Sequence, residues 1–328
     1  MTSTKHILVF PTYGYLKTKS DTKWTLNIKG WAFDSMENSK RRKFLSSVTR
    51  RILSPIHGSS QENKEKFSER TAPFMSAPLV NQTVRVSIVG IAQPPLPYSE
   101  DDDTLDDAEF SKLNQDDLKN GKGYVTKTFT TNASGLFEGS LEISLDEVAK
   151  LLPPKEIRTR LRVVYFLPEE LDTNYLGIIP LIEPEGISVV SDVDDTIKIS
   201  QVYDGLLKAA KKVFFGDLAD VPGMADSYNL LYAKGASIHY VSAGPFQLLP
   251  LVSHFIKSFN FPEGTLILRN TSEIPDSSDY KVGVITQYFK DFPHRKFLLV
   301  GDSGERDIET YERVRLQFPD QVTKVFIR

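Results

Sequence analysis

Polar side chains that could do chemistry follow three apolar runs of the sequence. Asp192 comes after ISVVS, Ser242 after IHYV, and Asp302 after FLLVG. In open parallel α/β sheets the carboxyl ends of the strands share one edge, and ligands bind beyond that edge. We therefore expect these three side chains to converge on one site.

Two carboxylates lie only two residues apart, at Asp192 and Asp194. An extended chain points side chains i and i+2 the same way, so the pair can divide the roles of nucleophile and acid. Asp302 would add a third carboxylate from another strand. Oxygen ligands that converge from separate strands suit Mg²⁺, which takes one or two carboxylates, several waters and a substrate phosphate.

Each of these residues also has a structural interpretation. Aspartate at a strand end often closes a turn or caps a helix. Ser242 alone is typical of a helix cap, and we interpret Asp195 as a capping residue rather than a catalytic one. The joint occurrence of several such residues, in order, favours a catalytic site over a set of unrelated caps.

Four motifs together resemble those of the haloacid-dehalogenase phosphatases, namely DVDDT at 192–196, Ser242 at a strand end, Lys281, and GDSGERD at 301–307. The resemblance becomes more specific in five longer segments, namely ISVVSDVDDTIKIS, VPGMADSYNLL, IHYVSAGPFQLLP, GTLILRN and DFPHRKFLLVGDSGERDIETY. Over about residues 186–328 the chain is similar to the catalytic domain of the Mg²⁺-dependent phosphatidate phosphatases of the actin-patch-protein type. SAGP stands where SNSP or SSSP is common in that family.

The resemblance implies a two-step reaction through an aspartyl-phosphate. Asp192 would be the nucleophile, and Asp194 would protonate the leaving alkoxide and then activate water. Mg²⁺ would be held by Asp192, by the backbone carbonyl of Asp194 and by Asp302. Asp307 would support the metal site or orient the catalytic lysine, although it could simply cap the helix that follows.

Three further residues receive roles from the same resemblance. Thr196 would hold the motif loop, Ser242 would hydrogen-bond a phosphoryl oxygen, and Lys281 would neutralise the transferred group. Lys290 and Lys296 lie nearby in the sequence, so the motifs alone leave them as alternatives to Lys281.

The elements that must position these residues follow one pattern from about residue 186. Apolar runs alternate with segments of helical periodicity, which indicates a parallel α/β sheet. With the resemblance, we expect a Rossmann-like haloacid-dehalogenase sheet over 186–328. About 45 residues separate Thr196 from Ser242, and fewer than 40 separate Ser242 from Lys281. Neither gap holds a full cap domain, so the minimal cap predicts an open site suited to a phosphate presented at a surface.

Residues 1–185 are rich in short β-branched and aromatic runs bounded by Gly, Asn and Pro. This pattern predicts a mostly β, sandwich-like domain. Two polar insertions interrupt it, at about 36–75 and about 94–122, where the strand periodicity disappears.

Three segments could contact a surface or a partner. Residues 40–53 carry six basic residues and no acid. This pattern is equally typical of a membrane-binding amphipathic helix and of a solvated helix. Residues 206–218 combine lysines with Val213, Phe214 and Phe215, and could enter a lipid interface, although an ordinary packed helix is favoured. The prolines at Pro94–Pro97 could bind an SH3 or WW domain or merely lead a loop.

Composition excludes several classes of protein. Lys plus Arg is 40 and Asp plus Glu is 43, so no global charge recruits nucleic acid. The absence of cysteine excludes disulfide frameworks and thiol catalysis. The apolar run at the N-terminus is too short for a signal peptide. We therefore expect a cytoplasmic protein that is peripheral to membranes, and the resemblance adds cortical actin patches.

The leading hypothesis is a Mg²⁺-dependent phosphatase that converts phosphatidate to diacylglycerol and phosphate at a membrane surface. One alternative keeps the chemistry and changes the substrate to a phosphoprotein or another phospholipid. A second alternative is a membrane or actin-patch adaptor with a non-catalytic α/β domain. Against it, a buried cluster of like charges destabilises a protein unless a metal or a partner compensates.

Overall fold

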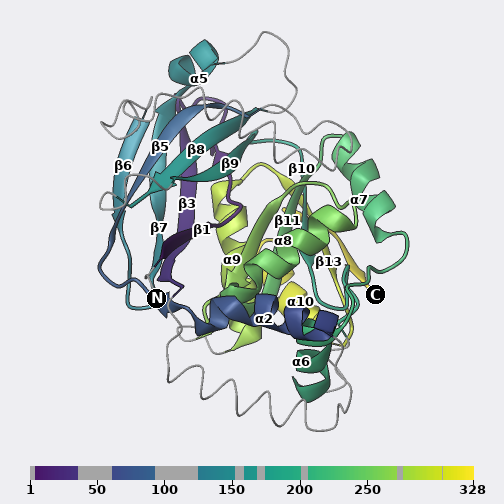
Figure 1. The fold of residues 1–328 in the computed structure, drawn as a ribbon. Helices are drawn as coiled ribbons and strands as arrows, with labels where there is room; N and C mark the ends of the chain where they lie inside the picture. Colours follow the sequence, from purple (N-terminus) through teal and green to yellow (C-terminus); the bar gives the residue numbers. More distant parts are fainter. Residues whose placement is uncertain are drawn as a thin grey trace. The chain divides into compact units, whose positions relative to one another are not determined.

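The computed structural model describes residues 4–35, 61–92, 125–151, 159–167, 174–200, 206–271, 276–304 and 306–328 (Figure 1). The chain divides into two compact units. The strand-rich unit comprises residues 5–33 and 78–183, and the α/β unit comprises residues 1–4, 34–77 and 184–328.

The strands of the N-terminal half form one nine-stranded sheet among the described residues. They are β1 (Lys5–Val9), β2 (Gly14–Tyr15), β3 (Lys23–Asp34), β4 (Ala77–Pro78), β5 (Thr83–Ile91), β6 (Val125–Thr130), β7 (Leu136–Ser144), β8 (Arg160–Phe166) and β9 (Asn174–Ile182). The order is β1-β3-β2-β9-β8-β5-β6, with β4 and β7 pairing on β3. A short helix, α5 (Leu145–Leu151), follows β7.

Alternating burial explains why this half folds as strands. In β3, Trp24, Leu26 and Ile28 are buried while the residues between them are partly exposed, which is the period of a strand with one face in the core. The same core includes buried residues of β5, β7 and β8, so these strands enclose it together with β3. The prediction of a strand-rich N-terminal half is confirmed.

The described residues of the α/β unit form five strands, the helices that connect them, and α2. Its strands are β10 (Ile187–Asp192), β11 (Ser237–Pro245), β12 (Thr265–Arg269), β13 (Lys296–Gly301) and β14 (Val322–Ile327). Its helices are α2 (Gln61–Met75), α6 (Leu206–Phe215), α7 (Met224–Ala233), the 3₁₀ turn η2 (Phe246–Leu248), α8 (Leu249–Ser258), α9 (Ser277–Asp291) and α10 (Asp307–Gln317).

All neighbouring strands of this sheet are parallel, in the order β12-β11-β10-β13-β14. The chain winds outward from β10 to β12, crosses back through α9, and continues through β13 to β14. Helices α7 and α8 lie on one face of the sheet and α9 on the other (Figure 1). The predicted parallel α/β sheet is thus confirmed, and its strand order reverses beside β10, where such sheets bind ligands.

The register of the sheet aligns the predicted site residues. Asp192, the last residue of β10, lies opposite Val241 of β11, so Ser242 follows one residue later. Asp302 directly follows the end of β13, which pairs with β10 on its other side. The parallel register therefore gathers the three strand-end side chains at one edge.

Helix α2 lies in the α/β unit, although its sequence is an insertion of the N-terminal half. The sequence placed residues 36–75 with the 1–185 domain, whereas the structure groups residues 34–77 with residues 184–328. Helix α2 belongs to the α/β unit because it packs there through an aromatic cluster, which no sequence pattern reveals. Phe67 stacks on Phe215 with ring centroids 4.8 Å apart, and Phe74 meets Phe214 edge-on at 5.7 Å.

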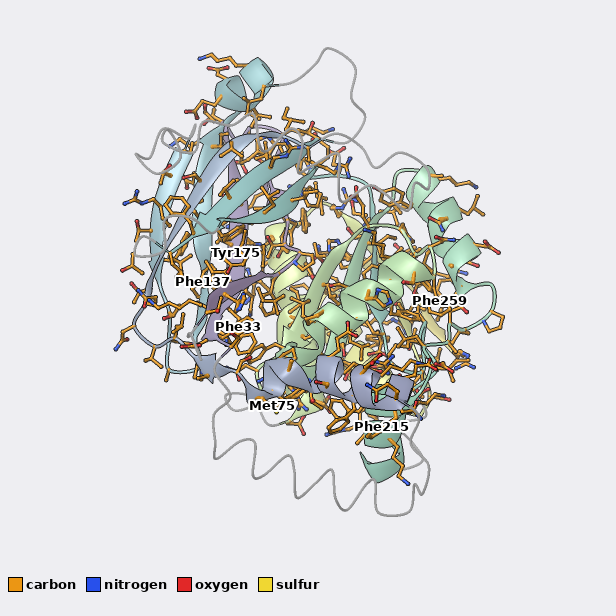
Figure 2. The ribbon with its side chains drawn as sticks, viewed as in Figure 1. Phe33, Met75, Phe137, Tyr175, Phe215 and Phe259 are labelled. Carbon is orange, nitrogen blue, oxygen red and sulfur yellow. The ribbon has the colours of Figure 1, made fainter. Side chains whose placement is uncertain are left out.

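Polar contacts reinforce the packing of α2 on α6, and the two helices lie side by side (Figure 1). Arg70 donates to the carbonyl oxygens of Val213 and Gly216, at 2.9 and 2.7 Å. These carbonyls lie at the carboxyl end of α6, where the helix itself offers no donor. Phe215 lies beside α2 (Figure 2), so the packed-helix interpretation of residues 206–218 holds for its described aromatic side chains.

Several predicted segments lie outside the described residues. They are the basic segment 40–53 and the whole insertion at 94–122, which includes Pro94–Pro97. Within the part of the chain that the structure describes, none of the helices has the length and apolar character needed to cross a bilayer.

A buried polar network holds the opposite, amino-terminal edge of the α/β sheet. His239 lies between the hydroxyl groups of Thr265 and Ser188, at 3.0 and 3.1 Å, and the Arg295 Nε donates to Ser188 at 2.9 Å. Complete burial lowers the pKa of His239 to about 3, and the nearby guanidinium of Arg295 adds to the effect. His239 is therefore a neutral core residue.

This network predicts an acid-sensitive fold. Between about pH 6.5 and about pH 3 the unfolded chain binds a proton at His239 that the folded protein does not, so the free energy of unfolding falls as the pH falls. We expect His239→Gln to lose less thermal stability than the wild type between about pH 7 and about pH 4.5. The control is His254→Gln, at an exposed position on α8. Equal acid sensitivity in wild type and His239→Gln would contradict this prediction.

Candidate active site

A buried lysine joins two carboxylates at the carboxyl edge of the α/β sheet. The Lys281 Nζ donates to Asp192 Oδ1 and to Asp307 Oδ1, both at 2.6 Å. The three side chains are 4%, 1% and 0% exposed, respectively. Because water is excluded, each charge relies on its partners for compensation.

Three separate elements supply these groups. Asp192 ends β10, Lys281 lies on α9, and Asp307 begins α10. The Asp276 carboxylate fixes the start of α9 by accepting hydrogen bonds from the backbone N–H groups of Ser278 and Asp279, at 2.9 and 3.0 Å. A capped first turn places Lys281 at the sheet edge at low conformational cost.

A third carboxylate completes the cluster. Ligand oxygens of Asp192, Asp302 and Asp307 all lie within 4.8 Å of one another, and all three residues are buried. Asp302 Oδ2 accepts a hydrogen bond from the Gly304 backbone N–H at 2.6 Å, and the Asp302 N–H donates to Asp307 Oδ2 at 3.3 Å. The backbone thus ties the two carboxylates to each other.

The donor set of this cluster fits a hard divalent cation. Three carboxylates and one lysine leave two formal negative charges in a buried volume, which is unfavourable without further compensation. All the donor atoms are oxygens, which Mg²⁺ prefers, and Mg²⁺ binds them at roughly 2.0–2.1 Å. Asp192, Asp302 and Asp307 are therefore the residues that could hold a metal, and no Asp194 carboxylate oxygen belongs to this group.

Asp194 lies beside the cluster with partners of its own. Its Oδ2 accepts from the Ser242 Oγ at 3.2 Å, and its Oδ1 accepts from the Ser200 Oγ at 2.5 Å and from the Lys198 Nζ. Burial alone would raise the pKa of Asp194. The charge of Lys198 and the hydrogen bonds from Lys198, Ser200 and Ser242 outweigh burial and hold that pKa below its usual value.

A tight turn follows β10, beginning at Val193 between the two motif aspartates and including Asp194. The N–H groups of Ile197 and Lys198 both donate to the Val193 carbonyl, at 3.1 and 3.0 Å. Within this turn the Thr196 hydroxyl donates to Asp192 Oδ2 at 3.0 Å. Asp192 is therefore held through both oxygens, by Thr196 on one and Lys281 on the other.

Asp195 stabilises the same turn. It has a left-handed φ of 56°, which Asp adopts more readily than most residues. Its carboxylate accepts from the Ser200 N–H at 2.8 Å, so it braces the loop as the capping interpretation predicted. Ser242 also accepts from the N–H of Gly244 at 3.1 Å, so its hydroxyl both braces a turn and contacts Asp194.

The structure distinguishes the three candidate lysines by position. Lys281 is buried in the cluster, whereas Lys290 and Lys296 are exposed. The Lys296 Nζ donates to the Asp320 carbonyl at 2.6 Å, at the start of β13 and away from the site. All seven predicted site residues lie at the carboxyl edge, namely Asp192, Asp194, Thr196, Ser242, Lys281, Asp302 and Asp307.

Sequence reasoning missed two residues of the site, Lys198 and Ser200. Both are buried, and both contact Asp194 Oδ1. The sequence signal that could have indicated Lys198 is its position four residues after Asp194, because a turn brings residues i and i+4 together.

The site thus lies in a parallel α/β unit and consists of a buried carboxylate and lysine cluster. Comparison with known families matches residues 187–328 to the family model described as "Phosphatidate phosphatase APP1, catalytic domain". The resemblance to the phosphatidate phosphatases of the actin-patch-protein type, which the motifs indicated, is confirmed for this part of the chain.

Two curated relatives are similar to parts of the chain. The chain is 36% identical over 171 residues to the phosphatidate phosphatase APP1 of Saccharomyces cerevisiae, which covers 49% of this chain and 28% of that protein. It is 27% identical over 210 residues to an uncharacterised protein of Schizosaccharomyces pombe, covering 60% and 34%. The chain therefore matches only about a third or less of the length of these relatives.

One solved structure, a class C acid phosphatase from Bacillus anthracis, is 16% identical, covering 43% of this chain and 66% of its own. Its TM-score is 0.28, which supports no argument about the site.

Close packing around Asp307 gives a test of the cluster. A Cβ added at Gly301 would lie 2.4 Å from Asp307 Oδ2, whereas one added at Gly283, on α9, would meet nothing within 4 Å. We expect Gly301→Ala to lower the free energy of unfolding by about 1–3 kcal/mol. Gly283→Ala should raise it by about 0.5–1 kcal/mol, because glycine is unfavourable within a helix. Urea unfolding measures both, and an unchanged midpoint in Gly301→Ala would contradict the packing.

Proposed function

We propose that the α/β unit is a Mg²⁺-dependent phosphatidate phosphatase that releases diacylglycerol and phosphate through an aspartyl-phosphate. The observation that carries this proposal is the cluster of Asp192, Asp302 and Asp307 around Lys281. It supplies a nucleophile, a lysine cation and oxygen ligands at one point of the sheet edge. The family match over residues 187–328 supports the substrate, since both the family and the yeast relative are named for phosphatidate phosphatase.

We assign the unit to the haloacid-dehalogenase fold. Support comes from the central position of β10 and from the tight turn that follows it. The chain then forms a two-stranded ribbon, in which the Ile199 N–H donates to the Ala219 carbonyl and the Val221 N–H donates to the Ile197 carbonyl, both at 2.9 Å. In this proposal the ribbon and α6 would form the minimal cap that the spacing of the motifs predicts.

In the first step a carboxylate oxygen of Asp192 attacks phosphorus and forms the new P–O bond. The bond from phosphorus to the lipid oxygen breaks, and Asp194 gives its proton to the departing alkoxide. Asp194 would carry this proton because the negative charge of the bound phosphoryl group favours its neutral form and opposes the effect of Lys198. In the second step Asp194 takes a proton from water, which attacks the phosphorus of the aspartyl-phosphate. Inorganic phosphate leaves, Asp192 is regenerated as a carboxylate, and Asp194 is protonated again.

The contacts of the site support the remaining roles. Thr196 and Lys281 each hold one oxygen of Asp192, so the carboxylate is oriented before substrate arrives. The positive charge of Lys281 also offsets the charge of a phosphoryl group brought next to Asp192. Ser242, one residue beyond the register position of Asp192, would donate to a phosphoryl oxygen.

Asp192, Asp302 and Asp307 would hold the metal with the backbone carbonyl of Asp194. Bound Mg²⁺ supplies Lewis-acid stabilisation of the phosphoryl oxygens. Asp307 also orients Lys281 through the 2.6 Å contact, so it serves both groups.

We further propose that the protein acts at the surface of membranes, because its substrate is a lipid headgroup. Association with cortical actin patches, and with SH3 or WW domains through Pro94–Pro97, follows from the family resemblance and from the proline sequence. These remain predictions about segments and partners outside the described residues.

The direct test is phosphate release from phosphatidate in mixed micelles, with Mg²⁺ and with EDTA. Wild type should release phosphate only with Mg²⁺, and Asp192→Asn should lower the rate by at least about a thousandfold because the nucleophile is lost. The matched control is Asp226→Asn, at an exposed position of α7, which should leave the rate unchanged.

A soluble aryl phosphate distinguishes the alternatives. Asp192-dependent turnover of the aryl phosphate without turnover of phosphatidate would keep the chemistry and reject the lipid. No Asp192-dependent turnover of either substrate would reject the phosphatase.

A further inference from the structure

A second buried lysine, Lys198, contacts the motif loop at Asp194, whereas Lys281 contacts Asp192. Lys198 has a side chain only 6% exposed, and its Nζ contacts Asp194 Oδ1 and the Ser200 Oγ. The proposed mechanism gives it no role. A buried ammonium group destabilises a fold unless it is fully compensated, so its presence at this position calls for an explanation.

The two carboxylate oxygens of Asp194 differ in the number and length of the hydrogen bonds that they accept. Oδ1 accepts from both Lys198 and Ser200, whereas Oδ2 accepts from Ser242 at the longer distance of 3.2 Å. A carboxylate oxygen has two acceptor positions, so the strong pair of donors occupies Oδ1. Oδ2 remains on the side of Ser242, the residue that would contact the phosphoryl group.

The backbone fixes the point from which Lys198 reaches Asp194. Its N–H donates to the Val193 carbonyl at 3.0 Å, and its own carbonyl accepts from the Asp195 N–H at 2.7 Å. The backbone of Lys198 also forms an antiparallel β-bridge with the backbone of Asp220 in the two-stranded ribbon. The turn on one side and the ribbon on the other thus leave the side chain little freedom to point elsewhere.

We propose that Lys198, with Ser200, is a positioning residue of the reaction. It anchors Asp194 Oδ1, so that Oδ2 is the oxygen that delivers the proton to the leaving group. Lys198 acts through Asp194 and does not touch the substrate. This inference rests on the proposed phosphatase function and gives a role to a residue to which the resemblance assigned none.

The inference predicts an effect that depends on the leaving group. An alkoxide needs a proton as the bond to phosphorus breaks, whereas a thiolate leaves without one. Loss of the anchor should therefore slow cleavage of an oxygen ester and spare cleavage of the corresponding sulfur ester. A residue that only stabilises the fold would affect both substrates alike.

The experiment compares short-chain phosphatidate with its analogue in which sulfur replaces the bridging oxygen. The variants are Lys198→Gln, which removes the charge, and Ser200→Ala, which removes one donor to the same oxygen without leaving a buried charge unpaired. Lys290→Gln, on the exposed face of α9, is the matched control. The quantity measured is kcat/KM, which reports the step in which the leaving group departs.

For the oxygen ester we expect kcat/KM to fall about 10–100-fold in both variants, as general acid catalysis is impaired. For the sulfur ester we expect a change of less than about threefold. Equal losses on both esters, or no loss on either, would overturn the inference while leaving the phosphatase intact. A wild type that cleaves neither ester would overturn the proposed function, and the inference with it.

Discussion

The site depends on one electrostatic constraint, which is the compensation of buried carboxylates. Lys281 donates to Asp192 and Asp307 at 2.6 Å in a volume from which water is excluded. With Asp302 included, the negative charges still exceed the positive ones by two. A protein keeps such an arrangement at a cost in stability, which a divalent cation and a phosphoryl transfer site would explain.

The α/β unit serves this constraint through its connectivity. Parallel register brings the ends of β10, β11 and β13 to one edge, and the strand order reverses beside β10, which is where such sheets bind ligands. Helices α9 and α10 enter at the same edge with Lys281 and Asp307 in their first two turns. The absence of a side chain at Gly301 makes room for the Asp307 carboxylate, so a strand residue far from the motif aspartates helps to set their geometry.

Much of this arrangement could be predicted from the sequence, because it follows from short-range rules. Polar residues after buried apolar runs indicated the strand ends, and the family resemblance favoured Lys281, with Lys290 and Lys296 left as alternatives. Two features could not be predicted in this way. Lys198 meets Asp194 only because of the turn at Val193. Helix α2 packs in the α/β unit through Phe67, Arg70 and Phe74, whose partners in and next to α6 lie about 150 residues later in the chain.

The most direct measurement for the central claim is Mn²⁺ binding by electron paramagnetic resonance, with Mn²⁺ in place of Mg²⁺. The account predicts that the wild type binds the ion and that Asp302→Asn, which removes one charge of the cluster, weakens binding by at least about tenfold. Asp226→Asn, on the exposed surface of α7, should bind like the wild type. Equal affinity in wild type and Asp302→Asn, or no binding by the wild type, would contradict the claim that this carboxylate cluster is a metal site.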